Sequence, residues 1–170
     1  MNFLFSYKKK TLKIFNKINT LNLILIVIIF LVDRYSKLNI IDNFNDSVFY
    51  FNSFINFDLI WNTGVGFGLF NTSSNIIYNS ITIFIGFVIT ILIFIMLISD
   101  KVEKIIYSLI IGGALGNFYD RIYFQAVPDF IDFHYKNFHW FTFNIADIFI
   151  TIGLIVLIIY EVPKKNNEKI

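Results

Sequence analysis

The chain has 170 residues, of which 56% are hydrophobic, 15% are charged and none is cysteine, and its formal net charge is +2. A single domain of this size cannot bury so much apolar surface in a water-soluble core, which excludes a soluble enzyme, a disordered chain and a disulfide-stabilised domain. The absence of cysteine excludes thiol catalysis and thiolate metal sites, and the small net charge gives no reason to expect nucleic acid as a partner.

Four stretches of the sequence meet the requirement for a membrane-spanning helix, which is about 20 mostly apolar residues. They are residues 19–37, 76–99, 104–122 and 143–162. We therefore expect a membrane protein of the all-α class, with four antiparallel transmembrane helices and with residues 1–170 forming one domain.

The two longer segments between these helices differ in character. Residues 48–62 are rich in aromatic side chains and partly alternate between apolar and polar positions, which predicts a small β element on the membrane surface. Residues 124–142 are expected to form a short loop. Its two histidines, His134 and His139, lack the spacing of a metal site and are expected to be interfacial side chains.

The distribution of basic residues predicts how the helices are oriented. Ten of the 14 Lys and Arg residues lie in the two tails and in the connection between the second and third helices, whereas residues 38–75 contain none. Because cytoplasmic segments are enriched in Lys and Arg, both termini are expected in the cytoplasm and the two longer segments outside. A cleaved signal peptide is disfavoured, because charged residues 33–37 follow the first apolar run without a cleavage site.

Polar side chains near the predicted helix ends indicate a functional site, because a charge at the bilayer centre costs about 2.5–3.5 kcal/mol on insertion scales. Every cluster of such residues is expected toward the outer face and none toward the cytoplasm. A carrier needs polar groups near the midplane, so this placement favours one polar site just below the outer surface. The clusters are Asp33, Arg34 and Lys37; Asn117, Asp120 and Arg121; Asp129 and Asp132; and Asn144 and Asp147.

Three of these carboxylates, Asp120, Asp129 and Asp147, are candidates for acid–base chemistry. Two carboxylates that share a site cannot both ionise cheaply, so one can act as a base on water while the other acts as an acid. Asp120 adjoins Arg121 and is expected to stay ionised by pairing with it, whereas Asp129 and Asp147 have apolar neighbours. The neighbouring charges therefore favour Asp129 and Asp147 as the reacting pair. Depth in the membrane alone leaves all three carboxylates as candidates.

Glycine occurs in two further patterns. The small residues at 112–116 have a spacing that lets membrane helices approach closely. Gly64, Gly66 and Gly68 do not form a phosphate-binding loop, because no Lys-Ser/Thr pair follows them. Asn62, beside these glycines, is instead expected to offer amide and backbone groups to a bound peptide.

Five short motifs occur in a specific order. They are DRYSK at 33–37, NTGVGFG at 62–68, GGALGNFYDR at 112–121, VPDF at 127–130 and FNIAD at 143–147. Over about residues 20–160 this order resembles the lipoprotein signal peptidase family, also called signal peptidase II. Members of that family are aspartic endopeptidases of the inner membrane, and they remove the signal peptide of prolipoproteins just before a diacylglyceryl-modified cysteine.

The resemblance implies roles for the polar residues. Asp129 and Asp147 would be the catalytic pair. The departures from the family pattern, Ser36, Gly66 and Pro128, leave both carboxylates in place. The residues that would bind substrate or support the site are Asn62, Gly64, Asn117, Arg121, Asn144, Asp33, Lys37 and Asp120.

The resemblance also implies the setting of the reaction. It implies no cofactor and no metal, and it matches the predicted β element to the family's extracytoplasmic β-cradle. The expected partners are lipid-modified prolipoproteins and membrane lipid, and a monomer is expected. The expected location is the bacterial cytoplasmic (inner) membrane, crossed several times, with the active site toward the extracytoplasmic face.

Two alternatives from other functional classes remain open. A small proton-coupled transporter would need a polar group near the midplane of the bilayer. A non-catalytic membrane scaffold would use the carboxylates for helix packing, and it predicts that Asp147→Asn leaves the protein functional.

Overall fold

Four helices and one four-stranded sheet make up the described part of the chain in this computed structural model. The structure describes residues 16–44, 48–64 and 74–167, without the side chains of 163–167. Gly66, Gly68 and most lysines of the two tails therefore lie outside the described residues. In chain order the elements are α1 (Lys17–Phe44), β1 (Phe49–Tyr50), β2 (Ile55–Asn62), α2 (Asn75–Ile98), α3 (Lys101–Tyr123), β3 (Val127–Tyr135), β4 (Phe138–Phe143) and α4 (Ile145–Asn167).

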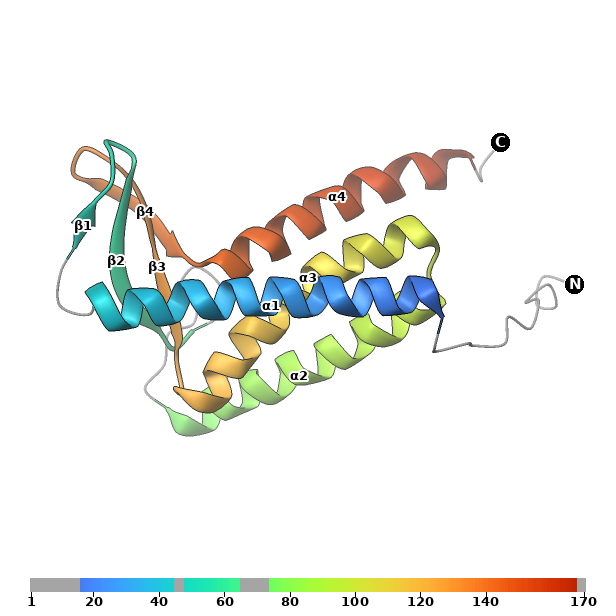
Figure 1. Cartoon of the computed structure of the whole chain (residues 1–170), viewed down its shortest axis with the longest axis horizontal. Helices are drawn as coiled ribbons and strands as arrows, with labels where there is room; N and C mark the ends of the chain where they lie inside the picture. The colour runs from blue at the N-terminus through green and yellow to red at the C-terminus, as the bar shows by residue number, and fades with distance from the viewer. Residues whose placement is uncertain (1–15, 45–47, 65–73, 168–170) are drawn as a thin grey trace, which may run out of the picture.

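Helix α3 lies at the centre of the arrangement, because it contacts α1, α2 and α4. The sheet lies at one end of the helices, and the start of α1 and the end of α4 lie at the other end (Figure 1). The end of α1 packs against the sheet, where Ile40 contacts Phe130 and Ile131 of β3. The outer segments of the chain are therefore gathered at one end of the bundle.

Helix α1 differs from its predicted extent. It was expected to end at the charged segment 33–37, but it continues to Phe44. Asp33 and Lys37 are fully buried within it and are 2.7 Å apart as an ion pair. Because these charges are neutralised inside the protein, they do not require the helix to end. The charged side chains of this segment thus face the interior of the bundle.

The other helices begin close to the predicted positions. Helix α3 begins at Lys101, where the Glu103 side chain accepts the backbone N–H of Asp100 at 3.3 Å. Helix α4 begins after Asn144, whose side-chain oxygen accepts the backbone N–H of Asp147 at 3.0 Å. This cap fixes Asp147 in the first turn of α4.

The sheet is antiparallel throughout, in the order β1–β2–β3–β4. The strands predicted within residues 48–62 are confirmed as β1 and β2. The expected loop over residues 124–142 is wrong, because β3 and β4 form a hairpin there, with Lys136 at the turn in the left-handed region, φ 55°. The register pairs Ile60 with Asp129 and Asn62 with Val127, which places the end of β2 beside the start of β3.

Two glycines of α3 allow a close approach of its neighbours. A Cβ at Gly113 would lie 2.5 Å from the backbone oxygen of Ala146, and one at Gly116 would meet the carboxylate of Asp33. The predicted role of the 112–116 segment in close helix packing is confirmed. These contacts bring the start of α4 and the charged segment of α1 against the same part of α3.

A second buried polar cluster lies at the end of the helices away from the sheet. The Lys104 ammonium donates to the Asn19 side chain at 2.7 Å and to the backbone oxygen of Leu97 at 2.9 Å. Nearby, Ser108 donates to the Asn22 side chain at 3.0 Å. The expectation that no polar cluster lies at this end is wrong, because helices also use such hydrogen bonds to pack.

Two helices in the described residues are long and apolar enough to cross a membrane, Asn75–Ile98 and residues Ile145–Val162 of α4. The structure is thus mostly helical with a small antiparallel sheet, as predicted. Four membrane crossings remain a prediction.

Candidate active site

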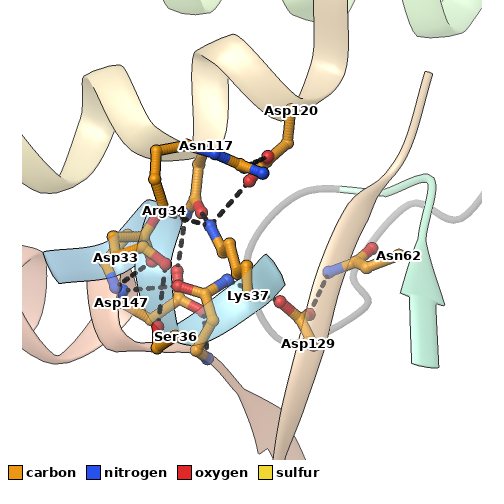
Figure 2. A network of polar contacts seen from close by, with 11 residues as sticks. Asp33, Arg34, Ser36, Lys37, Asn62, Asn117, Asp120, Asp129 and Asp147 are labelled. Carbon is orange, nitrogen blue, oxygen red and sulfur yellow. Dashed lines mark hydrogen bonds and ion pairs between the residues drawn. The ribbon is translucent and has the colours of Figure 1, made fainter. Parts of the chain in front are cut away.

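The predicted site residues come together where α1, α3 and the start of α4 meet the sheet. Figure 2 shows Asp33 and Lys37 on α1, with Asn117 and Asp120 of α3 facing them and Asp129 on its strand nearby. All ten residues proposed from the sequence are buried except Asn117 and Asp147, which are half-buried. Polar groups gathered in a protein interior require hydrogen-bond partners, and the described contacts supply most of them, with Nη1 of Arg121 as an exception.

Asp129 lies near the start of β3 and is 3% exposed. Its two oxygens accept hydrogen bonds from two asparagine amides, Asn62 at 2.8 Å and Asn144 at 2.6 Å. Backbone donors fix the orientation of both amides, because Gly64 N–H donates to the Asn62 oxygen at 2.8 Å and Asp147 N–H donates to the Asn144 oxygen. Both amide groups therefore present N–H to the carboxyl group.

Asp147 lies in the first turn of α4. One of its oxygens accepts the side-chain N–H of Asn117 at 2.8 Å, and the other accepts the backbone N–H of Asn144 at 3.2 Å. The N-terminal end of a helix favours negative charge, because its backbone N–H groups point outward without partners. These hydrogen-bond donors thus stabilise a negative charge on Asp147.

Asn144 connects the two carboxyl groups, since its amide donates to Asp129 while its backbone N–H donates to Asp147. Burial and the nearby charge of Asp147 raise the pKa of Asp129 to about 7. Asp129 therefore holds a proton at or below neutral pH, while the donors around Asp147 can stabilise a negative charge there. An acid and a base side by side are what peptide hydrolysis through an activated water requires.

Asp120 is fully buried and pairs with two cations of α1. Its carboxylate accepts from Arg34 and, at 2.7 Å, from Lys37. The expectation that Arg121 would be its partner is wrong, because consecutive residues of a helix point in different directions. Asp120 is thus an ion-paired carboxylate, as predicted, but with partners from another helix.

Arg121 instead points to the end of β2. Its guanidinium donates to the backbone oxygen of Gly64, and it lies over the Tyr78 ring at 5.6 Å. The Tyr78 hydroxyl donates to the backbone oxygen of Arg121 at 3.0 Å, a contact that the sequence did not predict. The second guanidinium nitrogen, Nη1, is buried and has no hydrogen-bond partner among the residues that the structure describes. It is a donor available to a bound group.

Lys37 donates to three side chains of the site. Its ammonium donates to Asp33 at 2.7 Å and to the Asn117 oxygen at 2.8 Å, in addition to Asp120. The other oxygen of Asp33 accepts the backbone N–H of Ala146 at 2.9 Å, directly before Asp147. Lys37 and Asp33 thereby join α1 to both α3 and the start of α4.

The histidines and Asp132 form a separate group on the hairpin. His139 Nδ1 lies 2.7 Å from the Asp132 carboxylate, and its ring stacks on His134 with centroids 5.4 Å apart. His134 is only 5% exposed, so the prediction that it is interfacial is wrong. Asp132 does not belong to the predicted single polar site, because its side chain is taken up by this pair. In the part of the chain that the structure describes, no three His, Asp or Glu side chains are grouped as metal ligands.

An apolar pocket of about 250 Å³ adjoins Asp147 on the side of α4 and β4. The sequence did not predict it, because its lining combines a strand with one face of a helix. The residues that line it are Phe141, Phe143, Asp147, Ile148, Thr151 and Ile152. A site with one carboxylate at the edge of an apolar pocket suits a substrate that has both a peptide bond and an apolar group.

Comparison with known proteins gives consistent results. The family model for signal peptidase (SPase) II matches residues 25–162. A lipoprotein signal peptidase of Pelagibacter ubique (strain HTCC1062) is 52% identical over 91% of this chain and 99% of its own length. One of Francisella tularensis subsp. novicida (strain U112) is 40% identical over 85% of this chain and 93% of its own length. A bacterial membrane enzyme solved by the in meso method at 2.3 Å has a TM-score of 0.73 at 29% identity, over 87% of this chain and 91% of that chain.

Proposed function

We propose, because this chain belongs to the signal peptidase II family, that it is an aspartic endopeptidase that removes the signal peptide from lipid-modified prolipoproteins. Asp129 and Asp147 are its catalytic pair. The observation that carries this assignment is the bridge through Asn144, which holds the buried carboxyl group of Asp129 beside the half-buried carboxyl group of Asp147. Family membership favours this function over a transporter or a scaffold.

The proposed reaction begins with a proton on Asp129 and a negative charge on Asp147. The ionised Asp147 takes a proton from a water molecule as the water oxygen attacks the carbonyl carbon of the scissile bond. Asp129 gives its proton to the carbonyl oxygen, which yields a tetrahedral diol. A proton then passes from Asp147 to the leaving nitrogen, the C–N bond breaks and a diol proton returns to Asp129. Each carboxyl group ends as it began, without a covalent intermediate.

The neighbouring polar residues orient the reacting groups. Asn62 and Asn144 hold the carboxyl group of Asp129, and Asn117 holds that of Asp147. The unpartnered Nη1 of Arg121 is a donor for a backbone oxygen of the substrate peptide. Gly64, fixed by Arg121, presents the end of β2 to the same peptide.

The substrate class follows from the pocket beside Asp147. An acyl chain on the cysteine that follows the scissile bond would occupy an apolar lining of this kind, next to the carboxylate that activates water. We therefore expect purified protein in detergent to cleave a precursor that carries diacylglyceryl on its cysteine. An unlipidated precursor with the same sequence is expected to be cleaved at least about tenfold less efficiently, since burial of each methylene contributes about 0.8 kcal/mol. A gel shift of the product measures both rates.

A matched pair of substitutions tests the pocket itself. Thr151→Trp places a large ring into it and is expected to raise KM for the lipidated precursor with little change in kcat. Ile155→Trp is the control, because Ile155 is on the same helix, is 51% exposed and does not line the pocket. Equal turnover of lipidated and unlipidated precursors would contradict the proposed substrate class.

The proposed membrane arrangement has four crossings, both termini in the cytoplasm and the site at the extracytoplasmic end of the bundle. It is supported by apolar side chains exposed on α1 and α3 as well as on α2 and α4, for example Leu31 at 56% and Ile105 at 52%. The sheet, with the site beside it, lies at the end of the bundle away from the start of α1 and the end of α4 (Figure 1). One copy suffices, since every site residue comes from one chain. Labelling of a single cysteine at position 10 or 165 from outside the cell would contradict this orientation.

A further inference from the structure

Three asparagine side chains donate to the carboxyl groups of Asp129 and Asp147. The amide oxygen of each asparagine accepts a hydrogen bond from a different donor. The oxygens of Asn62 and Asn144 accept backbone N–H groups. The oxygen of Asn117 accepts from a side chain instead, the Lys37 ammonium at 2.8 Å. The orientation of the group that holds Asp147 therefore depends on one lysine of another helix.

The chemistry of the ammonium group permits only one orientation of Asn117. A lysine ammonium has three donors and no acceptor, whereas an amide has an oxygen that accepts and a nitrogen that donates. If the amide rotated by half a turn, its nitrogen would face the ammonium and its oxygen would face the Asp147 carboxylate. Both contacts would then be repulsive. Lys37 thus keeps the Asn117 N–H directed at Asp147, where the present distance is 2.8 Å.

Lys37 is itself held without freedom to move. It is fully buried, and its three hydrogen bonds to Asp33, Asn117 and Asp120 match the three donors of its ammonium. A group with all its donors engaged and no access to water has no alternative partner. Its position, and hence that of the Asn117 amide, is as fixed as that of the backbone donors at Asn62 and Asn144.

We propose that Lys37 is a positioning residue for the water-activating carboxylate of Asp147, acting through the Asn117 amide, and that this role is separable from its contribution to stability. The proposal rests on the proposed function, because it assigns Lys37 to the same reaction. The charged groups around Asp147 come from three other elements. They are Asp33 and Lys37 on α1, Asp120 and Arg121 on α3, and Asp129 on β3.

The test compares Lys37→Met with Arg34→Met in the full chain in detergent. Both substitutions remove one cation from Asp120, on the same helix, but Arg34 donates to Asp120 and not to Asn117. Both variants are expected to lower the thermal midpoint. Only Lys37→Met is expected to lower kcat, by roughly 10- to 100-fold, since one hydrogen bond to a charged group loses its orientation. KM is expected to change less than twofold, and the acid limb of the kcat profile is expected to move to higher pH.

A double-mutant cycle with Asn117→Ala tests whether the effect passes through the amide. The double variant is expected to have the kcat of Asn117→Ala alone, because Lys37 then has no amide left to orient. If Lys37→Met does not fold, Lys37→Gln takes its place, since it keeps an N–H donor in a shorter side chain and is expected to lose less kcat.

Two results would overturn the proposal: losses in kcat that multiply in the double variant, or an Arg34→Met loss equal to that of the Lys37 variant. Either would assign Lys37 a purely structural role while wild-type cleavage leaves the proposed function intact. Failure of the wild-type protein to cleave a lipidated precursor would instead contradict the proposed function.

Discussion

Asp129→Asn and Asp147→Asn are each expected to reduce kcat for the lipidated precursor by on the order of 10³-fold or more, while the protein remains folded in detergent. Asparagine has the shape of aspartate but can neither hold a negative charge nor exchange a proton at neutral pH. Loss of the general base or the general acid removes a contribution of about 10²- to 10⁴-fold. Cleavage measured by gel shift, with thermal unfolding of the same sample, separates loss of chemistry from loss of fold.

Asp132→Asn is the matched control for this experiment. Asp132 lies on the same strand as Asp129 and is equally buried, at 4% exposed, but its carboxylate is bonded to His139 and lies outside the site. It is expected to keep wild-type kcat. Normal cleavage by Asp129→Asn, together with a folded but inactive Asp120→Asn, would mean that the catalytic pair is Asp120 with Asp147.

The protonation of Asp129 provides a second readout of the same pair. Its pKa is raised from 3.8 to about 7, so the folded protein holds this proton over a pH range in which the unfolded chain has lost it. Activity that needs the proton is expected to fall as the pH rises through about 7. The same shift makes folding less favourable as the pH rises from about 4 to about 7, because the folded state then binds more protons than the unfolded state. Asp129→Asn is expected to abolish this part of the pH dependence of stability.

Asp120→Asn is expected to act on stability, lowering the free energy of unfolding by about 3–5 kcal/mol. Asp120 is fully buried and is paired with both Arg34 and Lys37. Removing its charge leaves two buried cations with the single carboxylate of Asp33 nearby, and an unpaired buried charge is costly. The folded fraction is expected to keep kcat within about tenfold of wild type, because Lys37 still donates to Asp33 and Asn117.

A charge-balanced double variant tests whether an unpaired buried cation causes the loss of stability in Asp120→Asn. Asp120→Asn combined with Arg34→Met leaves one cation, Lys37, facing one anion, Asp33. It is expected to recover part of the thermal midpoint lost in Asp120→Asn alone. An unchanged midpoint in Asp120→Asn, or a double variant less stable than either single one, would show that this ion pair does not stabilise the fold.

Local sequence was sufficient for the elements whose signal is local. Helix α2 is apolar along its whole length, and its observed bounds, Asn75–Ile98, match the predicted 76–99. The strands within residues 48–62 were also visible in the alternation of side chains. The ordered motifs identified the residues of the site, because each motif is a short run of adjacent positions. Charged residues interrupt the apolar pattern in two segments, and local reasoning was wrong in both. It ended the first helix at residues 33–37, and it missed the hairpin in residues 124–142.

The composition and motif order of the sequence by itself determined that this is a helical membrane protein and that it belongs to its family, and they predicted most of the residues that gather in the polar site, Asp132 excepted. Only the tertiary structure decided the partners within that site. Lys37 and Asn117 are separated by 80 positions along the chain, and Asn62 and Asp129 by 67. Contacts at such separations depend on which helix faces pack together and on strand register. A local pattern contains neither, so it assigned Asp120 to its neighbour Arg121 rather than to Arg34 and Lys37 on another helix.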